Sequence, residues 1–202
     1  VEPKSEKWFR RWLGSDEFLN GYERWCLWLG ECSPSELRAM PEVMKRVQAV
    51  KNSRLASKSP PTRKLADTPT RFHVEFMPTS PYLVIPEVSS ERREYIPLGY
   101  LESSTLASDR LRLLPNAGLI EFGVLCSSMH NAWMRYTCGR LESRYNYSNT
   151  IVYNNYPWPG FAGEPLSDKH RNAIKQAAQC VLDARAQFPG SSLADLYDPL
   201  TM

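Results

Sequence analysis

No stretch of this 202-residue sequence approaches the roughly 20 consecutive apolar residues that a transmembrane helix needs, and no signal-peptide pattern precedes the first charged segment. The sequence also lacks the G-x-G-x-x-G and Walker phosphate-binding loops, the G-x-S-x-G nucleophile motif, and the F-x-G-x-G and N-P-P-Y elements of DNA amino-methyltransferases. Residues 154–157 share letters with N-P-P-Y in the wrong order. Because these motifs are absent, we expect that the chain is not itself a catalyst. Because it starts at Val1 without a methionine, we expect a piece of a longer protein, located in the cytoplasm and with no membrane partner.

Cysteine and histidine are few and scattered. The odd number of cysteines includes no C-x-x-C pair, and several lie in apolar runs, which is typical of reduced core thiols in a cytoplasmic protein. The histidines have no metal-ligand spacing, so we expect neither a metal site nor a bound cofactor in this piece. The residues concerned are Cys26, Cys32, Cys126, Cys138 and Cys180, with His73, His130 and His170.

The charge is small overall but uneven. A formal net charge of +3 excludes a polybasic nucleic-acid arm, yet nine basic residues between Arg38 and Arg71 face only Glu42 and Asp67. Such a block suits an anionic polymer and would make its binding salt-dependent. The alternative is a solvated helix face followed by a basic loop. If the block binds DNA, its side chains and neighbouring cations are expected to contact phosphates: Lys51, Arg54, Lys58, Arg63, Lys64, Arg71 and Arg92.

The apolar spacing predicts an α+β fold, in which a mainly antiparallel sheet carries two long helices and a C-terminal helical extension follows. Ser33, Pro34 and Glu36 predict the start of a helix that runs to about Ser53. A second helix is expected over residues 116–139 and a third over 168–186, capped by Ser167. Strands are expected at residues 22–29, 72–76, 82–88, 95–101 and 111–114, a polar loop at 54–70, and the tryptophans are expected to be buried.

One stretch, Tyr82–Leu101, joins two apolar segments through the charged turn, which we define as Ser89–Glu94. Its sequence, SSERRE, presents two guanidiniums and two carboxylates. Arginine matches the N7/O6 edge of guanine, and glutamate can accept a hydrogen bond from the cytosine amino group. The turn is therefore a candidate for base contacts, and the alternative is an ordinary solvated hairpin tip.

Several segments together carry a family resemblance. The sequence resembles the target-recognition domain, with the start of the C-terminal helical region, of MmeI-like (type IIL/IIG) restriction-modification proteins. The matching segments are Pro3–Trp8, Tyr22–Leu29, Ser33–Met40, Arg54–Lys58, Thr62–Ala66, Val88–Tyr100, Phe122–Arg140 and Ile151–Pro159. The resemblance implies that residues 1–160 form a DNA target-recognition domain and that residues 161–202 begin a C-terminal helical region.

The same resemblance implies a function and a set of site residues. The function is recognition of a specific duplex-DNA sequence on behalf of an adenine-N6 methyltransferase that uses S-adenosylmethionine, located in the same polypeptide. A nuclease with Mg²⁺ can also belong to such a parent. The base contacts implied are Glu91 with Arg93, then Tyr95, and Lys58 and Ser59 in the basic block. The alternative from another class is a protein–protein interaction module that binds a partner subunit.

Overall fold

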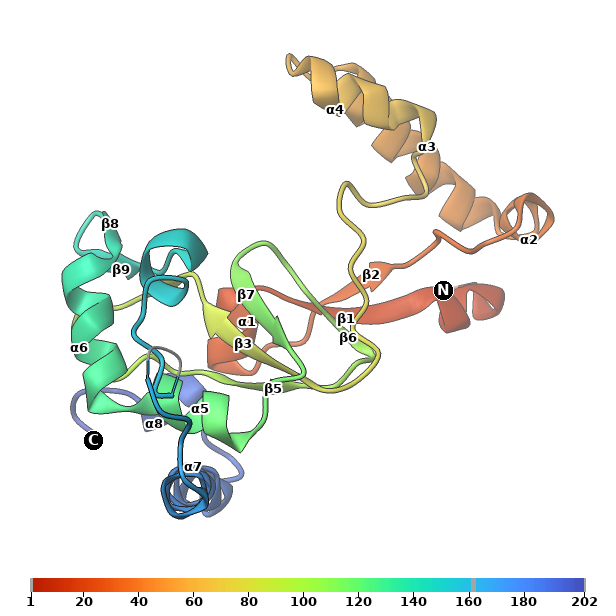
Figure 1. The fold of residues 1–202 in the computed structure, drawn as a ribbon. Helices are drawn as coiled ribbons and strands as arrows, with labels where there is room; N and C mark the ends of the chain where they lie inside the picture. Colours follow the sequence, from red (N-terminus) through yellow and green to blue (C-terminus); the bar gives the residue numbers. More distant parts are fainter. Residues whose placement is uncertain (1, 161–162, 202) are drawn as a thin grey trace. The chain divides into compact units, whose positions relative to one another are not determined.

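The computed structural model describes residues 2–160 and 163–201, and the chain forms two units (Figure 1). Unit 1 contains the residues up to Arg11 together with Trp25–Met77. Unit 2 contains Trp12–Arg24 together with Pro78 and the residues after it. Strand β1 (Phe9–Leu13) crosses from the first unit to the second.

Unit 1 consists of a short strand pair and a set of helices. The first residues of β1 pair antiparallel with β2, from Phe9 opposite Leu27 to Arg11 opposite Trp25. A strand was predicted at residues 22–29, which include β2, and none was predicted at β1. The elements are η1 (Pro3–Trp8), β2 (Trp25–Leu27), α2 (Pro34–Arg38), α3 (Pro41–Leu55), α4 (Pro60–Lys64) and η2 (Leu65–Asp67).

The helix predicted from Pro34 to about Ser53 begins as expected but is broken. Ser33 Oγ accepts from Glu36 N at 3.3 Å, and the Glu36 carboxylate accepts from Ser33 N at 3.2 Å. The prediction of a single helix was wrong. Pro41 cannot donate an interior helical hydrogen bond, so a new helix, α3, begins there. The apolar residues of this stretch are not all buried either, since Met40 is buried whereas Val50 is 39% exposed.

Two other predictions for unit 1 were wrong. The polar loop expected at residues 54–70 contains α4 and η2, because Pro60 and Pro61 fit the first turn of a helix. No strand forms over residues 72–76. The Glu75 carboxylate accepts from Phe72 N at 3.1 Å and from the Arg71 guanidinium at 2.7 Å, so local bonds replace a strand ladder.

Unit 2 is organised around β3 (Tyr82–Pro86), every residue of which is buried. It pairs antiparallel with β5 (Gly99–Leu101) on one side and β7 (Leu111–Pro115) on the other (Figure 1). A second small sheet has the order β4-β9-β8. The remaining elements are α1 (Ser15–Asn20), β4 (Val88–Ser89), β6 (Thr105–Ala107), α5 (Leu119–Cys126), α6 (Ser128–Thr137), β8 (Gly139–Leu141), β9 (Arg144–Asn146), η3 (Asn149–Tyr153), α7 (Asp168–Ala186) and α8 (Leu193–Leu196).

The α+β class, the antiparallel pairing and the C-terminal helix are confirmed, although the sheet is divided into small three-stranded sheets. Ser167 caps α7 as predicted, with its Oγ accepting from His170 N. The helix predicted over residues 116–139 is two helices, because Ser127 adopts extended backbone angles and caps α6. The domain boundary was expected between residues 160 and 161. Residues 161–162 lie outside the described residues.

Helix α7 lies directly on α5. An added Cβ at Gly123 would lie 2.9 Å from Ile174 Cγ2 and 3.1 Å from Ala178 Cβ, so only glycine permits this approach of the two helices. Ala178 belongs to the same buried cluster as Leu125 and Leu98. The C-terminal helix is therefore part of the core of unit 2.

The expectations for tryptophan and cysteine were partly wrong. Trp25 is 51% exposed, whereas Trp133 and Trp158 are half-buried and their indole N–H groups donate to backbone carbonyls. The five cysteines are free thiols, and Cys180 is exposed and not in the core. Within the described residues, no helix has both the length and the apolar character required to cross a bilayer.

A buried polar pair, His130 and Tyr147, joins α6 to the chain just after β9. His130 is 0% exposed, and its ring nitrogens lie 2.9 Å from Leu125 O and 3.0 Å from the Tyr147 hydroxyl. Because a carbonyl oxygen can only accept, Nδ1 carries the proton and Nε2 accepts from Tyr147. Burial lowers the pKa of His130 to about 4, so the ring is neutral in the folded protein at neutral pH.

This burial predicts an acid-sensitive fold. In the unfolded chain His130 is protonated as the pH falls through its ordinary pKa of about 6.5, whereas in the folded chain it is protonated only near its lowered pKa of about 4. The free energy of unfolding should therefore drop by about 2 kcal/mol between pH 7 and pH 5. Chemical denaturation at both pH values should show this drop in the parent chain and in the exposed-site control His170→Gln. A drop of the same size in His130→Gln would contradict the assignment.

Candidate nucleic-acid interface

The charged turn leaves β4 and is closed by short-range bonds. Ser90 O accepts from Arg93 N at 3.2 Å, and Ser90 Oγ accepts from Arg92 N at 3.2 Å. Glu91 and Arg92 are exposed, whereas Arg93 is half-buried. Glu94 is exposed as well, so the turn presents two carboxylates and one guanidinium to solvent and holds a second guanidinium against the protein.

The sequence predicted strands directly on both sides of the turn, as in a hairpin, but the turn is not the tip of a tight hairpin. The pairing of β3 with β5 stops at Val84 opposite Gly99. The chain in between first joins another sheet, where Val88 pairs with Asn146 and Ser89 with Tyr145 of β9. The strand expected from Tyr95 accordingly starts only at Gly99, and the residues before it are buried without strand structure.

Side chains replace the missing strand partners of the segment Glu94–Leu98. Arg135 donates to Glu94 O, Ile96 N donates to Asn131 Oδ1 at 2.9 Å, and Arg185 Nη1 donates to Leu98 O at 2.7 Å. Buried backbone groups need such partners, because leaving one unpaired costs about as much as a lost hydrogen bond. The three bonds therefore fix the backbone that follows Arg93.

Two of these three side chains lie on α6. Asn131 is 0% exposed, and its Nδ2 also donates to Ser127 O at 2.9 Å, next to the Ser127 cap that starts the helix. Asn131, Arg135 and Arg185 were missed as site residues from the sequence. Only the segment Phe122–Arg140, which carries part of the family resemblance, includes the first two.

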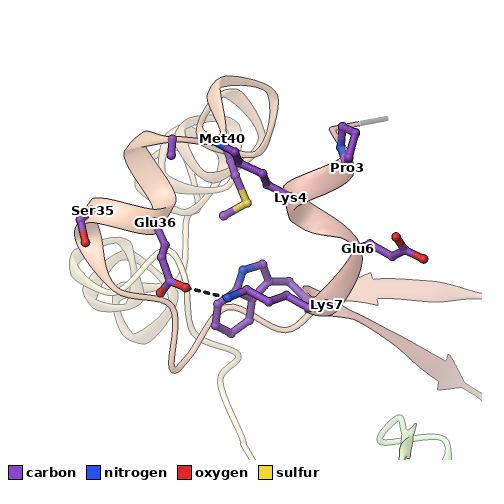
Figure 2. A pocket seen from close by; sticks show the side chains of 9 residues that line it. Pro3, Lys4, Glu6, Lys7, Ser35, Glu36 and Met40 are labelled. Atoms are coloured by element: carbon purple, nitrogen blue, oxygen red, sulfur yellow. Dashed lines mark hydrogen bonds and ion pairs between the residues drawn. The ribbon is translucent and has the colours of Figure 1, made fainter.

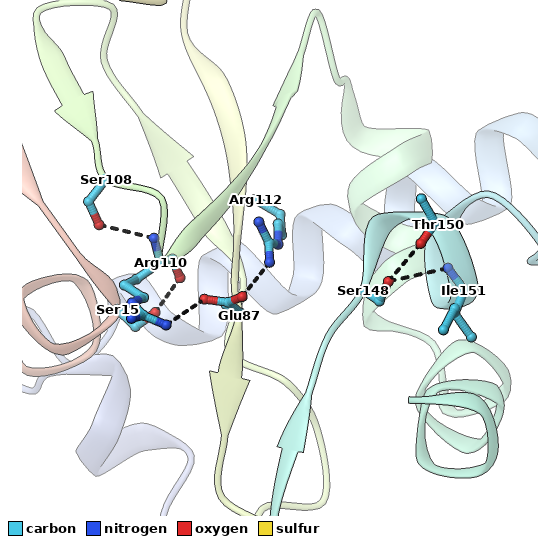
Figure 3. A network of polar contacts seen from close by, with 8 residues as sticks. All are labelled: Ser15, Glu87, Ser108, Arg110, Arg112, Ser148, Thr150 and Ile151. Carbon is cyan, nitrogen blue, oxygen red and sulfur yellow. Dashed lines mark hydrogen bonds and ion pairs between the residues drawn. The ribbon is translucent and has the colours of Figure 1, made fainter. Parts of the chain in front are cut away.

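A polar network lies just before β4, around Glu87 (Figure 3). Its carboxylate accepts from Arg110 at 3.2 Å and from Arg112. Its backbone O also accepts from Tyr147 N at 2.7 Å, so Glu87 ties β7 to the chain after β9. Ser148 caps η3, with its Oγ accepting from Ile151 N (Figure 3). These bonds fix the backbone at Glu87, two residues before the charged turn begins at Ser89.

The basic block forms the helical arm of unit 1, defined as Pro41–Asp67. Lys51, Lys58 and Lys64 are exposed on it, as is Ser59. Two of its arginines, Arg54 and Arg63, bond backbone carbonyls, whereas Arg46 is exposed. Arg54 donates to Leu65 O, Thr68 O and Arg71 O at 2.7–2.9 Å, and Arg63 donates to Ser57 O at 2.9 Å and Lys58 O at 3.0 Å. Beyond the arm, Arg71 bonds Glu75 and Gly30 O.

The predicted site residues thus form two separate sets. Lys51, Lys58, Ser59 and Lys64, with the engaged arginines, lie in unit 1, and the charged turn with Tyr95 lies in unit 2. In unit 1 these lysines leave their charges free for a ligand, while Arg54, Arg63 and Arg71 donate to backbone carbonyls. Across the described residues, no group of three or more His, Cys, Asp or Glu side chains could hold a metal ion.

Unit 1 also contains a pocket of about 750 Å³ that the sequence did not indicate (Figure 2). Trp8, Met40 and Pro3 give it an apolar wall, and Lys7 pairs with Glu36 at 2.6 Å on its rim. The hydrogen bond from Lys7, followed by those from Ser33, lowers the pKa of Glu36 to about 2. The rim is thus an ion pair over most of the pH range.

The bonds of Arg54 predict a mainly structural role within the arm. Arg54→Met removes three hydrogen bonds and should lower the protection of α4 and η2 amides against hydrogen exchange by about 1–3 kcal/mol. Lys51→Met, an exposed change on the same helix, is the matched control and should leave protection unchanged. Equal protection in both variants would show that Arg54 does not hold the arm together.

Comparison with known proteins gives one consistent result. The family model "MmeI, target recognition domain" matches residues 1–160, and "MmeI, C-terminal domain" matches residues 166–202. DNA methyltransferase A of Bacillus subtilis (strain 168) is 37% identical over 200 residues, which cover 99% of this chain and 22% of that protein. The structure of the type IIL restriction-modification enzyme MmeI in complex with DNA matches 100% of this chain with a TM-score of 0.94 and 48% identity, and this chain covers 26% of it. The chain belongs to the MmeI target recognition domain family and continues into the MmeI C-terminal domain.

Proposed function

We propose that this chain recognises a specific duplex-DNA sequence and directs a methyltransferase of the same polypeptide to it. The observation that carries the proposal is the match, over the whole chain, to an enzyme whose structure was solved in complex with DNA. The reaction proposed for the parent is transfer of a methyl group from S-adenosylmethionine to adenine N6, in the cytoplasm. A nuclease domain that uses Mg²⁺ is a second activity proposed for the parent.

Base recognition is proposed for Glu91 and Arg93 together. Arg93 would donate to a guanine, and Glu91 would accept from the paired cytosine or orient Arg93. Burial lowers the pKa of Arg93, and the negative charge of Asp198 partly offsets this shift. The Arg93 guanidinium is therefore partly desolvated, and charge-assisted hydrogen bonds are strong in such a place. Tyr95, Lys58 and Ser59 are proposed as further base contacts.

Phosphate contacts are proposed for the exposed cations and, with less freedom to move, for the engaged arginines. Lys51, Lys64 and Arg92 are exposed and can meet a phosphate without breaking a bond described above. Arg54, Arg63 and Arg71 would have to share guanidinium donors that already serve backbone carbonyls. We also propose a functional division at about residue 160, with recognition before it and a C-terminal helical region after it.

Salt dependence tests the function. A cognate duplex would be selected from a randomised pool with the 202-residue chain, and its affinity measured by fluorescence anisotropy between 50 and 200 mM salt. About five phosphate contacts give a log–log slope of about −4 to −5. Failure to enrich any sequence, or an affinity that is flat with salt, would overturn the proposal and favour a protein-interaction module.

Arg93 should carry discrimination at one base pair. Arg93→Ala should weaken binding to the selected duplex by about 1–3 kcal/mol and reduce the penalty for replacing one base pair of the site. The matched control is Arg92→Ala, which should weaken binding to every duplex alike, as loss of a phosphate contact does. An equal loss for Arg93→Ala on selected and scrambled duplexes would make Arg93 a phosphate contact instead.

A further inference from the structure

We propose that Arg185, in the C-terminal helix α7, is a positioning residue for base recognition by the charged turn. The inference rests on the proposed function and deepens it. It assigns part of the DNA specificity to a residue within the segment that matches the MmeI C-terminal domain, whereas the turn lies within the segment that matches the target recognition domain.

The first observation is the backbone bond that Arg185 makes. Its Nη1 donates to Leu98 O at 2.7 Å, a contact between residues 87 positions apart. Leu98 is fully buried and lies just before Gly99, where the pairing with β3 resumes. Because residues 96–98 have no strand partner, this bond sets where the chain returns from the charged turn to the sheet.

The second observation is that Arg185 itself is held on several sides. Its Nη2 donates to the Tyr197 hydroxyl, and its guanidinium lies 5.0 Å from the Tyr197 ring centroid and 5.4 Å from that of Phe122. Arginine suits such a place, because its planar guanidinium stacks on aromatic rings and bonds along its edge at the same time. The bond to Leu98 is therefore made by a group whose orientation is fixed.

The third observation connects the same C-terminal segment to Arg93. Tyr197, which receives the Arg185 bond, is followed by Asp198, and the charge of Asp198 acts on the Arg93 guanidinium. The Asp198 carboxylate is itself oriented, since its Oδ1 accepts from Leu200 N at 2.9 Å. Arg185 thus bonds the backbone after the turn and also Tyr197, the residue next to Asp198.

Base recognition needs this kind of support. A bidentate bond to a base edge tolerates displacements of about 0.5 Å, so recognition side chains depend on the groups that lock their backbone. Phosphate contacts by flexible lysines are far more tolerant. Loosening Leu98 should therefore reduce discrimination between sequences more than it reduces overall affinity.

Three variants of the full 202-residue chain test the inference, with the duplex selected above and a duplex in which the base pair assigned to Arg93 is replaced. Arg185→Gln should lower the ratio of the two affinities about five- to tenfold. Arg185→Lys keeps one donor for Leu98 O and should retain more of the ratio. Arg171→Gln, an exposed change on the same helix, should leave it unchanged.

A merely structural role would behave differently. It would lower affinity for both duplexes equally, and an unchanged ratio in folded Arg185→Gln would overturn the inference. In an Arg93→Ala background, Arg185→Gln should cause no further loss of the ratio, because the two residues act on the same base pair. Independent losses would also overturn it.

Two further measurements make the outcome decisive. If Arg185→Gln does not fold, Tyr197→Phe replaces it, because this change keeps the ring and removes only the acceptor of the Arg185 bond. The ratio should then fall in the same direction, and no change would overturn the inference. If the parent chain itself shows no preference between the duplexes, the proposed function fails, which differs from a failure of Arg185 alone.

Discussion

The second unit of this protein depends on one constraint, namely that buried backbone groups outside a strand ladder must still find hydrogen-bond partners. The chain leaves β3, joins a second sheet for two residues, and then returns through Glu94–Leu98 without strand pairing. Arg135, Asn131 and Arg185 supply the missing donors and acceptor. A surface turn with four charges can therefore vary at its exposed positions while its backbone is specified by residues elsewhere.

Two arginines and three lysines of the helical arm have different surroundings. Arg54 and Arg63 offer several donors in a fixed plane and are used to hold backbone carbonyls. Lys51, Lys58 and Lys64 remain exposed on flexible stems. A positively charged segment thus does not need to bind an anion through every cation it carries, and part of its charge is present because the geometry of guanidinium is useful for folding.

Local rules predicted much of the fold and little of the support for the site. The caps at Ser33 and Ser167 and the strands around β3 were predicted from spacing and capping residues. The helix breaks at Pro41 and Ser127 follow equally local rules, but continuous helices were predicted from the sequence at both places. The roles of Arg54 and Arg185 could not be predicted in this way. Their acceptors lie 11–17 and 87 residues away, so the bonds exist only once the tertiary structure has formed. The exposure of Glu91 and Arg92 could be predicted, because charged residues in a turn are usually exposed.

The close packing of α7 on Gly123 has a practical consequence for exchanging specificities between relatives. A chimera joined near residue 160 would combine one protein's α5 with another protein's α7, and a bulkier residue at either Gly123 or Ala178 would separate the helices. The guanidinium of Arg185 would then withdraw from the segment it supports, even though every residue of the transplanted turn was correct. The natural unit of exchange therefore extends through Tyr197, beyond residue 160, where the match to the target recognition domain ends.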